Sequence, residues 1–165
     1  MPGWNMITVP IDAGTDPDVV FAGLPLDSWL LYSWDPIHYQ YLDADRTTIT
    51  IGQGLWLKVS EATTLTLVGL PNEADTTTLS LASGWNMIGV PYEDTIPWDA
   101  VQVSKGGNTP VSLQQAIDSD WILDTFFHWS GVEYSPLTAG DSFLPLLGYW
   151  VKANVEGVRL ILPKP

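Results

Sequence analysis

The chain of 165 residues has no cysteine, which excludes disulfide bridges, thiolate metal sites and cysteine nucleophiles. Charged residues are also scarce, at 15% of the chain compared with about 25% in ordinary globular proteins. Basic residues are the scarcest, since six Lys and Arg stand against nineteen Asp and Glu, giving a formal net charge of −13. Because such a surface repels phosphate, we expect no nucleic acid among the partners.

Long apolar runs are missing as well. No stretch reaches the roughly 18 apolar residues that a membrane-spanning helix needs, so we expect no insertion into a membrane. The chain opens on Met1-Pro2-Gly3 and has no secretion signal. We therefore expect either a protein made without such a signal or domains taken from a longer chain with an added Met.

Aromatic residues, in contrast, are abundant, with nine Trp, six Tyr and four Phe. The 14 Gly and 13 Pro are scattered along the chain. This distribution is typical of many short strands joined by turns, and it differs from the clustered composition of a disordered linker.

Two aromatic signatures occur twice, in the same order. Residues 3–7 and 84–88 both read Gly-Trp-Asn-Met-Ile, and residues 54–58 and 148–152 share the pattern Gly-x-Trp-x-Lys. A duplication of this kind indicates two related modules in tandem.

The local patterns predict a mostly β protein. Short apolar runs that end at Gly or Pro are typical of strands, and helix-start signals precede only residues 17–21 and 113–117. With the duplication, they predict two tandem related β modules, at residues 1–70 and 71–165, with one or two short helices. Each module is expected to be a small barrel or a sandwich, and the two are expected in a pseudo-two-fold arrangement.

The last strand of each module is expected at residues 64–68 and 157–162, where β-branched residues gather. A further strand at residues 76–81 leads into the second copy and has no counterpart before the first. We therefore hypothesise that residues 159–162 complete the sheet of the first module and bring the chain ends together.

Eight of the nine tryptophans fall into repeat-equivalent pairs. Because repeats retain what holds a fold together, we expect these paired indoles in the core. Trp98 has no partner, so it is the tryptophan that we expect to be exposed. The four pairs are Trp4/Trp85, Trp29/Trp121, Trp34/Trp129 and Trp56/Trp150.

The signatures resemble a repeat common in bacterial and archaeal extracellular proteins, which opens Gly-Trp-Asn-Leu-Ile-Gly-x-Pro and closes Gly-Lys-Gly-Tyr-Trp-Val-Lys. Residues 84–91 match the opening with Met87 in place of Leu, and residues 148–152 match the closing motif. The first copy is looser, since Thr8 replaces Gly. The resemblance covers nearly the whole chain. It implies a β-rich accessory module displayed outside the cell, with no assigned catalytic residues.

We therefore expect a non-catalytic structural and interaction module at an extracellular or cell-surface location, acting as a spacer, adhesion or assembly unit. Its expected partners are proteins or glycans, and no cofactor is expected. The first alternative is a carbohydrate-binding module, because flat aromatic rings pack on the apolar face of a pyranose. Its candidate contacts are Trp98 and the hairpin tyrosines Tyr39, Tyr41 and Tyr134, of which we align Tyr39 with Tyr134. A second alternative is a virion or surface-layer building block.

Catalytic and metal-binding patterns are weak. Asp118, Asp120 and Asp124 offer oxygen ligands of the kind that calcium prefers, but the EF-hand pattern is absent, and we expect solvated turn residues with no metal. The chain also lacks the Gly-x-Ser-x-Gly and phosphate-loop motifs. We expect no enzyme, although a glycosidase-type carboxylate pair meets only in space and leaves no sequence pattern.

Overall fold

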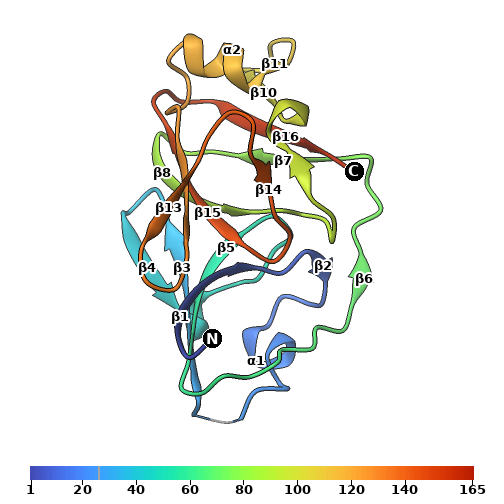
Figure 1. The fold of residues 1–165 in the computed structure, drawn as a ribbon, viewed down its shortest axis with the longest axis vertical. Coiled ribbons are helices and arrows are strands. Elements are labelled where there is room, and N and C mark those ends of the chain that lie inside the picture. The colour runs from blue at the N-terminus through green and yellow to red at the C-terminus, as the bar shows by residue number, and fades with distance from the viewer. Residues whose placement is uncertain (26) are drawn as a thin grey trace.

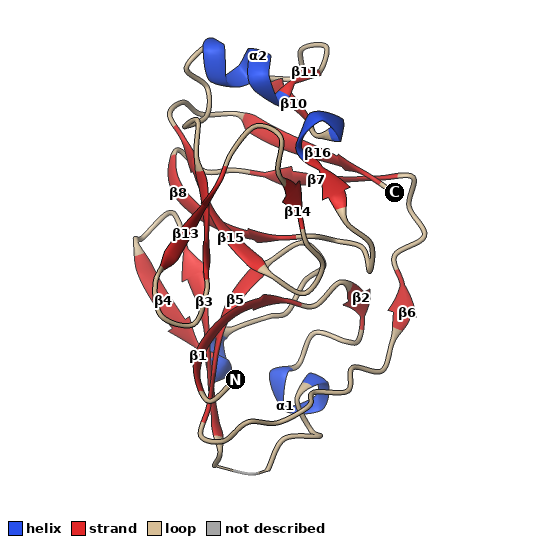
Figure 2. Cartoon of the chain, viewed as in Figure 1, coloured by secondary structure: helices blue, strands red, loops and turns tan. Residues whose placement is uncertain are grey.

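The computed structural model describes residues 1–25 and 27–165 and is mostly β, as the sequence predicts (Figure 1). Antiparallel sheets form most of the described chain, and its α-helices are short (Figure 2). None of the sheets formed by the described residues closes on itself. The architecture is therefore an open sandwich of related modules, and the barrel alternative is wrong.

The first module is built on a four-stranded antiparallel sheet. A helix, a 3₁₀ turn and a short two-stranded pair complete it: α1 (Pro17–Val20), η1 (Ala44–Arg46), β2 (Ile11–Asp12) and β6 (Leu70–Pro71). The predicted start of α1 is confirmed, since the carboxylate of Asp16 accepts a hydrogen bond from the Asp18 amide and Pro17 occupies the first turn. The sheet strands, in spatial order, are β1 (Gly3–Thr8), β5 (Gly54–Val59), β3 (Trp29–Asp35) and β4 (Gln40–Asp43).

The second module repeats this sheet. Its four strands, in the same spatial order, are β8 (Gly84–Gly89), β15 (Gly148–Ala153), β12 (Phe126–Trp129) and β13 (Tyr134–Leu137). In both sheets the opening signature pairs antiparallel with the closing signature along its whole length. The duplication in sequence is therefore a duplication of strand order.

Additional elements enlarge the second module. They are β7 (Thr76–Ser80), β9 (Ile96–Pro97), η2 (Trp98–Ala100), β10 (Gln102–Lys105), β11 (Val111–Ser112), α2 (Leu113–Asp118), β14 (Ser142–Phe143) and β16 (Val158–Pro163). The order β11-β10-β16-β7 forms a second four-stranded sheet. The predicted helix α2 is confirmed, and Ser112 and Gln115 form a capping box at its start.

Two strand predictions are wrong. Residues 159–162 do not complete the first sheet, because β16 pairs with β7 and β10 of its own module. Residues 64–68 form no strand. The corresponding β16 has a paired strand on each side, whereas the described part of the first module provides no strand beside residues 64–68.

The two modules exchange equivalent contacts, as a pseudo-two-fold arrangement requires. The Thr8 amide donates to the Leu146 carbonyl at 3.2 Å, and the Gly89 amide donates to the Gly52 carbonyl at 2.9 Å. These four residues correspond when Trp4 is laid on Trp85 and Trp56 on Trp150. The isolated bridges Ile7–Leu147 and Ile88–Gln53 repeat the same exchange.

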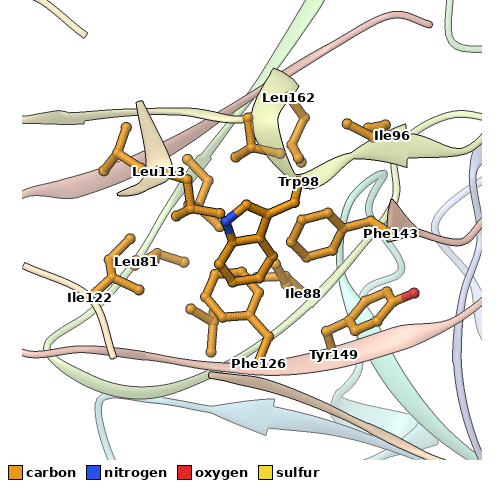
Figure 3. Packing of buried hydrophobic residues seen from close by; sticks show 14 of the residues in the cluster. Leu81, Ile88, Ile96, Trp98, Leu113, Ile122, Phe126, Phe143, Tyr149 and Leu162 are labelled. Carbon is orange, nitrogen blue, oxygen red and sulfur yellow. The ribbon is translucent and has the colours of Figure 1, made fainter. Parts of the chain in front are cut away.

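Trp98 lies at the centre of the second module's core and is 2% exposed (Figure 3). Its ring stacks parallel to Phe143, with centroids 5.8 Å apart, and tilts against Phe126 at 5.2 Å. The expectation that Trp98 is exposed is therefore wrong. Trp98 lies between the two signatures of the second copy, in η2, and packs in the same core as the signature residues Ile88 and Tyr149.

Candidate aromatic binding site

The repeated tryptophans do not form the module cores, contrary to the sequence-based expectation. Only Trp56 is buried, at 9% exposed, while Trp4 is 38% exposed and the others are half-buried. Trp29 and Trp121 pack at the edge of their own module's core. The remaining six gather where the two sheets face each other: Trp4, Trp34, Trp56, Trp85, Trp129 and Trp150.

Strand alternation places these rings. Successive side chains of a strand point to opposite faces of the sheet. In β3, Leu31 and Ser33 are buried, whereas Tyr32 and Trp34 are half-buried and line the space between the modules. Each sheet therefore turns one side toward its own core and directs the aromatic rings of its other side toward the twin module.

Two pockets open between the aromatic rings of the two sheets. The first has a volume of about 540 Å³ and the second about 510 Å³. Every described residue that lines them is aromatic. The first is lined by Trp4, Tyr32, Tyr41, Trp56, Trp129 and Tyr134. The second is lined by Trp85, Phe127, Tyr134, Trp150, Trp34 and Tyr41.

The pockets are equivalent under the pseudo-two-fold relation. Each lining residue of one has its repeat partner in the other, and Tyr41 and Tyr134 contribute to both. A single substitution separates the two linings, since Phe127 stands where the first pocket has Tyr32. We call the two adjoining pockets together the aromatic face.

Reciprocal hydrogen bonds fix the indoles between the modules. Trp34 Nε1 donates to the Trp85 carbonyl at 2.8 Å, and Trp129 Nε1 donates to the Trp4 carbonyl at 3.1 Å. Edge-to-face contacts add to this order, with Trp34 against Trp150 at 5.4 Å and Trp56 against Trp129 at 6.0 Å. The rings are therefore held in position before any ligand arrives.

Asp35 holds the β3–β4 turn that brings Tyr41 opposite Trp34. Its carboxylate lies 2.7 Å from His38 Nδ1 and also accepts from the His38 and Ile37 amides. The His38 hydrogen bond is the main cause that lowers the pKa of Asp35 to about 2. The turn therefore keeps an ionised cap at any ordinary pH.

The polar groups of the aromatic face are neutral. Burial raises the pKa of Tyr41, a hydrogen bond from Trp56 partly opposes this, and the neighbouring Tyr134 adds to the rise. Trp150 Nε1 donates to the Tyr134 hydroxyl at 3.3 Å. The face thus offers phenol hydroxyls and ring surfaces, and the described residues that line the two pockets include no carboxylate or imidazole that would exchange a proton with a bound molecule.

The repeated lysines occupy equivalent strand positions. Lys58 Nζ lies 5.7 Å from the centroid of the Trp4 ring, within cation–π range. Lys152 is the cross-strand neighbour of Trp85 in the same register. The first pocket therefore has a cation over one of its rings.

The predicted tyrosines have different outcomes. Tyr41 and Tyr134 both line the pockets. Tyr39 lines neither; its hydroxyl donates to the Ser83 carbonyl at 3.2 Å and its ring packs edge-on against Trp34. The alignment of Tyr39 with Tyr134 is wrong, because Tyr41 is the residue opposite Trp34, as Tyr134 is opposite Trp129.

The three aspartates considered for calcium have separate hydrogen-bond partners. Asp118 accepts from Gln114, Asp120 accepts from Asn154 at 2.7 Å, and Asp124 accepts from Thr125. Across residues 1–25 and 27–165, no group of three or more metal-ligating side chains is arranged to hold an ion.

Comparison with protein-family models, characterised protein sequences and solved structures finds no match to this chain. Among the helices that the structure describes, none has the length and apolar character needed to cross a bilayer.

Proposed function

We propose that this protein is a non-catalytic carbohydrate-binding module that holds a neutral glycan against its aromatic face. The observation that carries the proposal is that six of the nine tryptophans line two adjoining pockets. Aromatic side chains fixed by internal hydrogen bonds and left accessible at a shared hollow are typical of a ligand site.

The lining chemistry favours a sugar ring. The face of an indole carries negative charge density and attracts the C–H groups on the flat side of a pyranose. Binding sites commonly add a few polar groups that orient the ligand. Tyr32, Tyr41 and Tyr134 line the pockets, and their hydroxyls would take that role.

Charge favours a neutral ligand. The net charge of −13 opposes polyanions, including single-stranded nucleic acids whose bases would otherwise stack on such rings. Lys58, over the Trp4 ring, opposes a cationic group in the first pocket. An uncharged polysaccharide meets neither penalty.

The resemblance to extracellular repeats supports a location outside the cell or at its surface, where polysaccharides are available. In that setting the module would serve adhesion to a glycan. A purely structural spacer would use the aromatic face only to join its two modules and would bind no sugar.

Titration of intrinsic tryptophan fluorescence and isothermal titration calorimetry test the proposal. The ligands are neutral oligosaccharides of the glucan, xylan and mannan classes, with heparin as a charged comparison. We expect at least one neutral class to bind and heparin not to bind. Trp4→Ala and Trp85→Ala should each weaken binding by about 10-fold, because an aromatic stacking contact is worth on the order of 1–3 kcal/mol.

Trp121→Ala provides the matched control, since Trp121 is also a repeated, half-buried tryptophan but lines neither pocket. The Trp121→Ala variant should bind the oligosaccharide with the same affinity as the parent protein. Absence of binding across the panel, or equal loss in all three variants, would overturn the proposal and leave the structural spacer.

A further inference from the structure

Residues 60–69, which follow β5, form no strand, whereas their counterpart after β15 forms the strand β16. In the second module, that counterpart is β16, which buries alternate residues and is hydrogen-bonded on both edges, by β7 and by β10. In the first module, residues 60–69 form no strand. A strand position without its neighbours leaves backbone amides and carbonyls available for pairing.

The apolar pattern of a strand is nevertheless present there. Leu65 and Leu67 pack against the core of the first module, while Thr64, Thr66 and Val68 point outward, and Val68 is 83% exposed. This alternation parallels the buried Val158, Leu160 and Leu162 of β16. The side chains of residues 64–68 therefore alternate as in a strand, but no neighbouring strand forms backbone hydrogen bonds with them.

A groove runs beside this segment. It has a volume of about 210 Å³ and is bounded by Leu65 and Leu67 on one side and by Leu57 and Val59 of β5 on another. Met1 also lines it. The remaining lining residues are Asn5, Ile7, Thr8, Leu24, Thr63 and Leu146.

The hydrogen bonds at Met1 repeat those at Ala82, which lies between β7 and β8 in the second module. Asn86 Nδ2 donates to the Ala82 carbonyl at 2.8 Å and to the Gly84 carbonyl at 2.9 Å, which fixes the link between β7 and β8. Asn5 Nδ2 donates to the Met1 carbonyl at 2.9 Å and the Gly3 carbonyl at 3.0 Å. Met1 therefore occupies the place of Ala82, directly beside the position that β7 would have.

We propose that the first module is a strand acceptor, and that residues 63–68 with the adjoining groove bind one added antiparallel β-strand. The partner is an extended, uncharged peptide with leucine at alternate positions, as Leu79 and Leu81 stand in β7 and the residue that follows it, Thr-Thr-Thr-Leu-Ser-Leu. Leu79 of β7 lies opposite Leu160 of β16, so the incoming leucine would lie beside Leu65 and Leu67, the inward leucines of the segment. Main-chain pairing supplies affinity in this mode, and the alternate side chains supply specificity.

A fusion tests the proposal directly. A copy of residues 76–81, placed immediately before Met1, puts a β7 sequence where Met1 already follows the path of Ala82. We expect hydrogen exchange of the amides of residues 64–68 to slow at least about 10-fold, and the Tm to rise by about 2–4 °C. The same sequence added as a free peptide should give concentration-dependent protection of the same amides.

The matched control is the same fusion with Leu79→Asp and Leu81→Asp in the copied segment only, which keeps length and leaves the parent residues intact. Equal exchange rates in the two fusions would overturn the proposal. Protection of residues 64–68 that appears in the parent protein and grows with its own concentration would identify a second copy as the occupant, and would overturn it as well.

Discussion

Single residues of the aromatic face differ in the surroundings of their polar groups, and Tyr41 is a tyrosine whose pKa is displaced by them. It lies in both pockets, its ring packs against Trp34 at 5.1 Å, and burial raises its pKa above the ordinary value of 10.0. The folded state therefore favours the neutral phenol more strongly than the unfolded state does.

This shift predicts an alkaline loss of stability that depends on one hydroxyl. A raised pKa contributes stability that is complete below the unfolded value of 10.0 and is lost as pH rises through the folded value. The free energy of unfolding should therefore fall more steeply above about pH 10 in the parent protein than in Tyr41→Phe. Denaturant unfolding at a series of pH values checks this, and a difference that does not change with pH would contradict it.

Residue identity alone did not separate the tryptophans that line the pockets from those of the module cores. Repeat pairing led us to place Trp4 and Trp85 in the interior and Trp98 at the surface, and the structure reverses both assignments. A usable signal was present in the strands. Tyr32-x-Trp34 and Phe127-x-Trp129 put two aromatic rings on the face opposite the buried Leu31 and Phe126. Sequence does not reveal whether that second face meets solvent, a ligand or a twin module.

Among the secondary-structure elements, β5 and β15 each begin at a glycine that lies close against the backbone of the twin module. A Cβ atom on Gly54 would lie 2.7 Å from the Ile88 carbonyl oxygen, and one on Gly148 would lie 2.9 Å from the Ile7 carbonyl oxygen. Each obstacle is backbone of the partner module. The twin strands therefore cannot accept a side chain at these positions without separating the modules.

Gly54→Ala and Gly148→Ala should each destabilise the protein by about 1–3 kcal/mol, the usual cost of forcing extra atoms into a packed contact. The two values should be similar because the sites are equivalent. Gly23→Ala is the control, since a Cβ there meets no atom within 4 Å. Chemical denaturation measures all three. A cost at only one of the twin glycines would show that the modules do not pack in equivalent fashion.

Several elements were predictable because their signals are local. The caps of α1 and α2 and the short apolar runs of β1 and β8, each of which ends before a Pro, depend on a few adjacent residues. The failures at this scale depend on distant partners. Residues 64–68 have strand composition but no neighbouring strand, and the register of β4 depends on the turn at Asp35, which places Tyr41 opposite Trp34.

The whole molecule is joined through a shared aromatic and methionine cluster. Met6, Met87 and Trp56 are buried in it, and rings from both modules pack around them. Together with the reciprocal Trp34 and Trp129 hydrogen bonds, this cluster makes each module part of the other's surroundings. Neither half keeps Met6, Trp56 or Met87 buried without its twin.

We therefore expect one cooperative unfolding transition. Tryptophan fluorescence, which reports mainly the shared face, and far-ultraviolet circular dichroism, which reports both sheets, should give coincident denaturation curves. Two separated midpoints would show that the modules unfold independently. The duplication in sequence predicts the paired sheets, but only the packing of the sheets on each other predicts this coupling.

The exchanged bonds between the halves have a further consequence for recognition. A contact in which each side supplies the same groups to the other is isologous, the form found at the dyad of a symmetric homodimer, here contained in a single polypeptide. Tyr41 and Tyr134 stand at that dyad. A linear polymer lying across it would meet nearly the same surroundings whichever of its ends leads, and the one hydroxyl that Tyr32 has and Phe127 lacks is the difference by which polarity would be sensed.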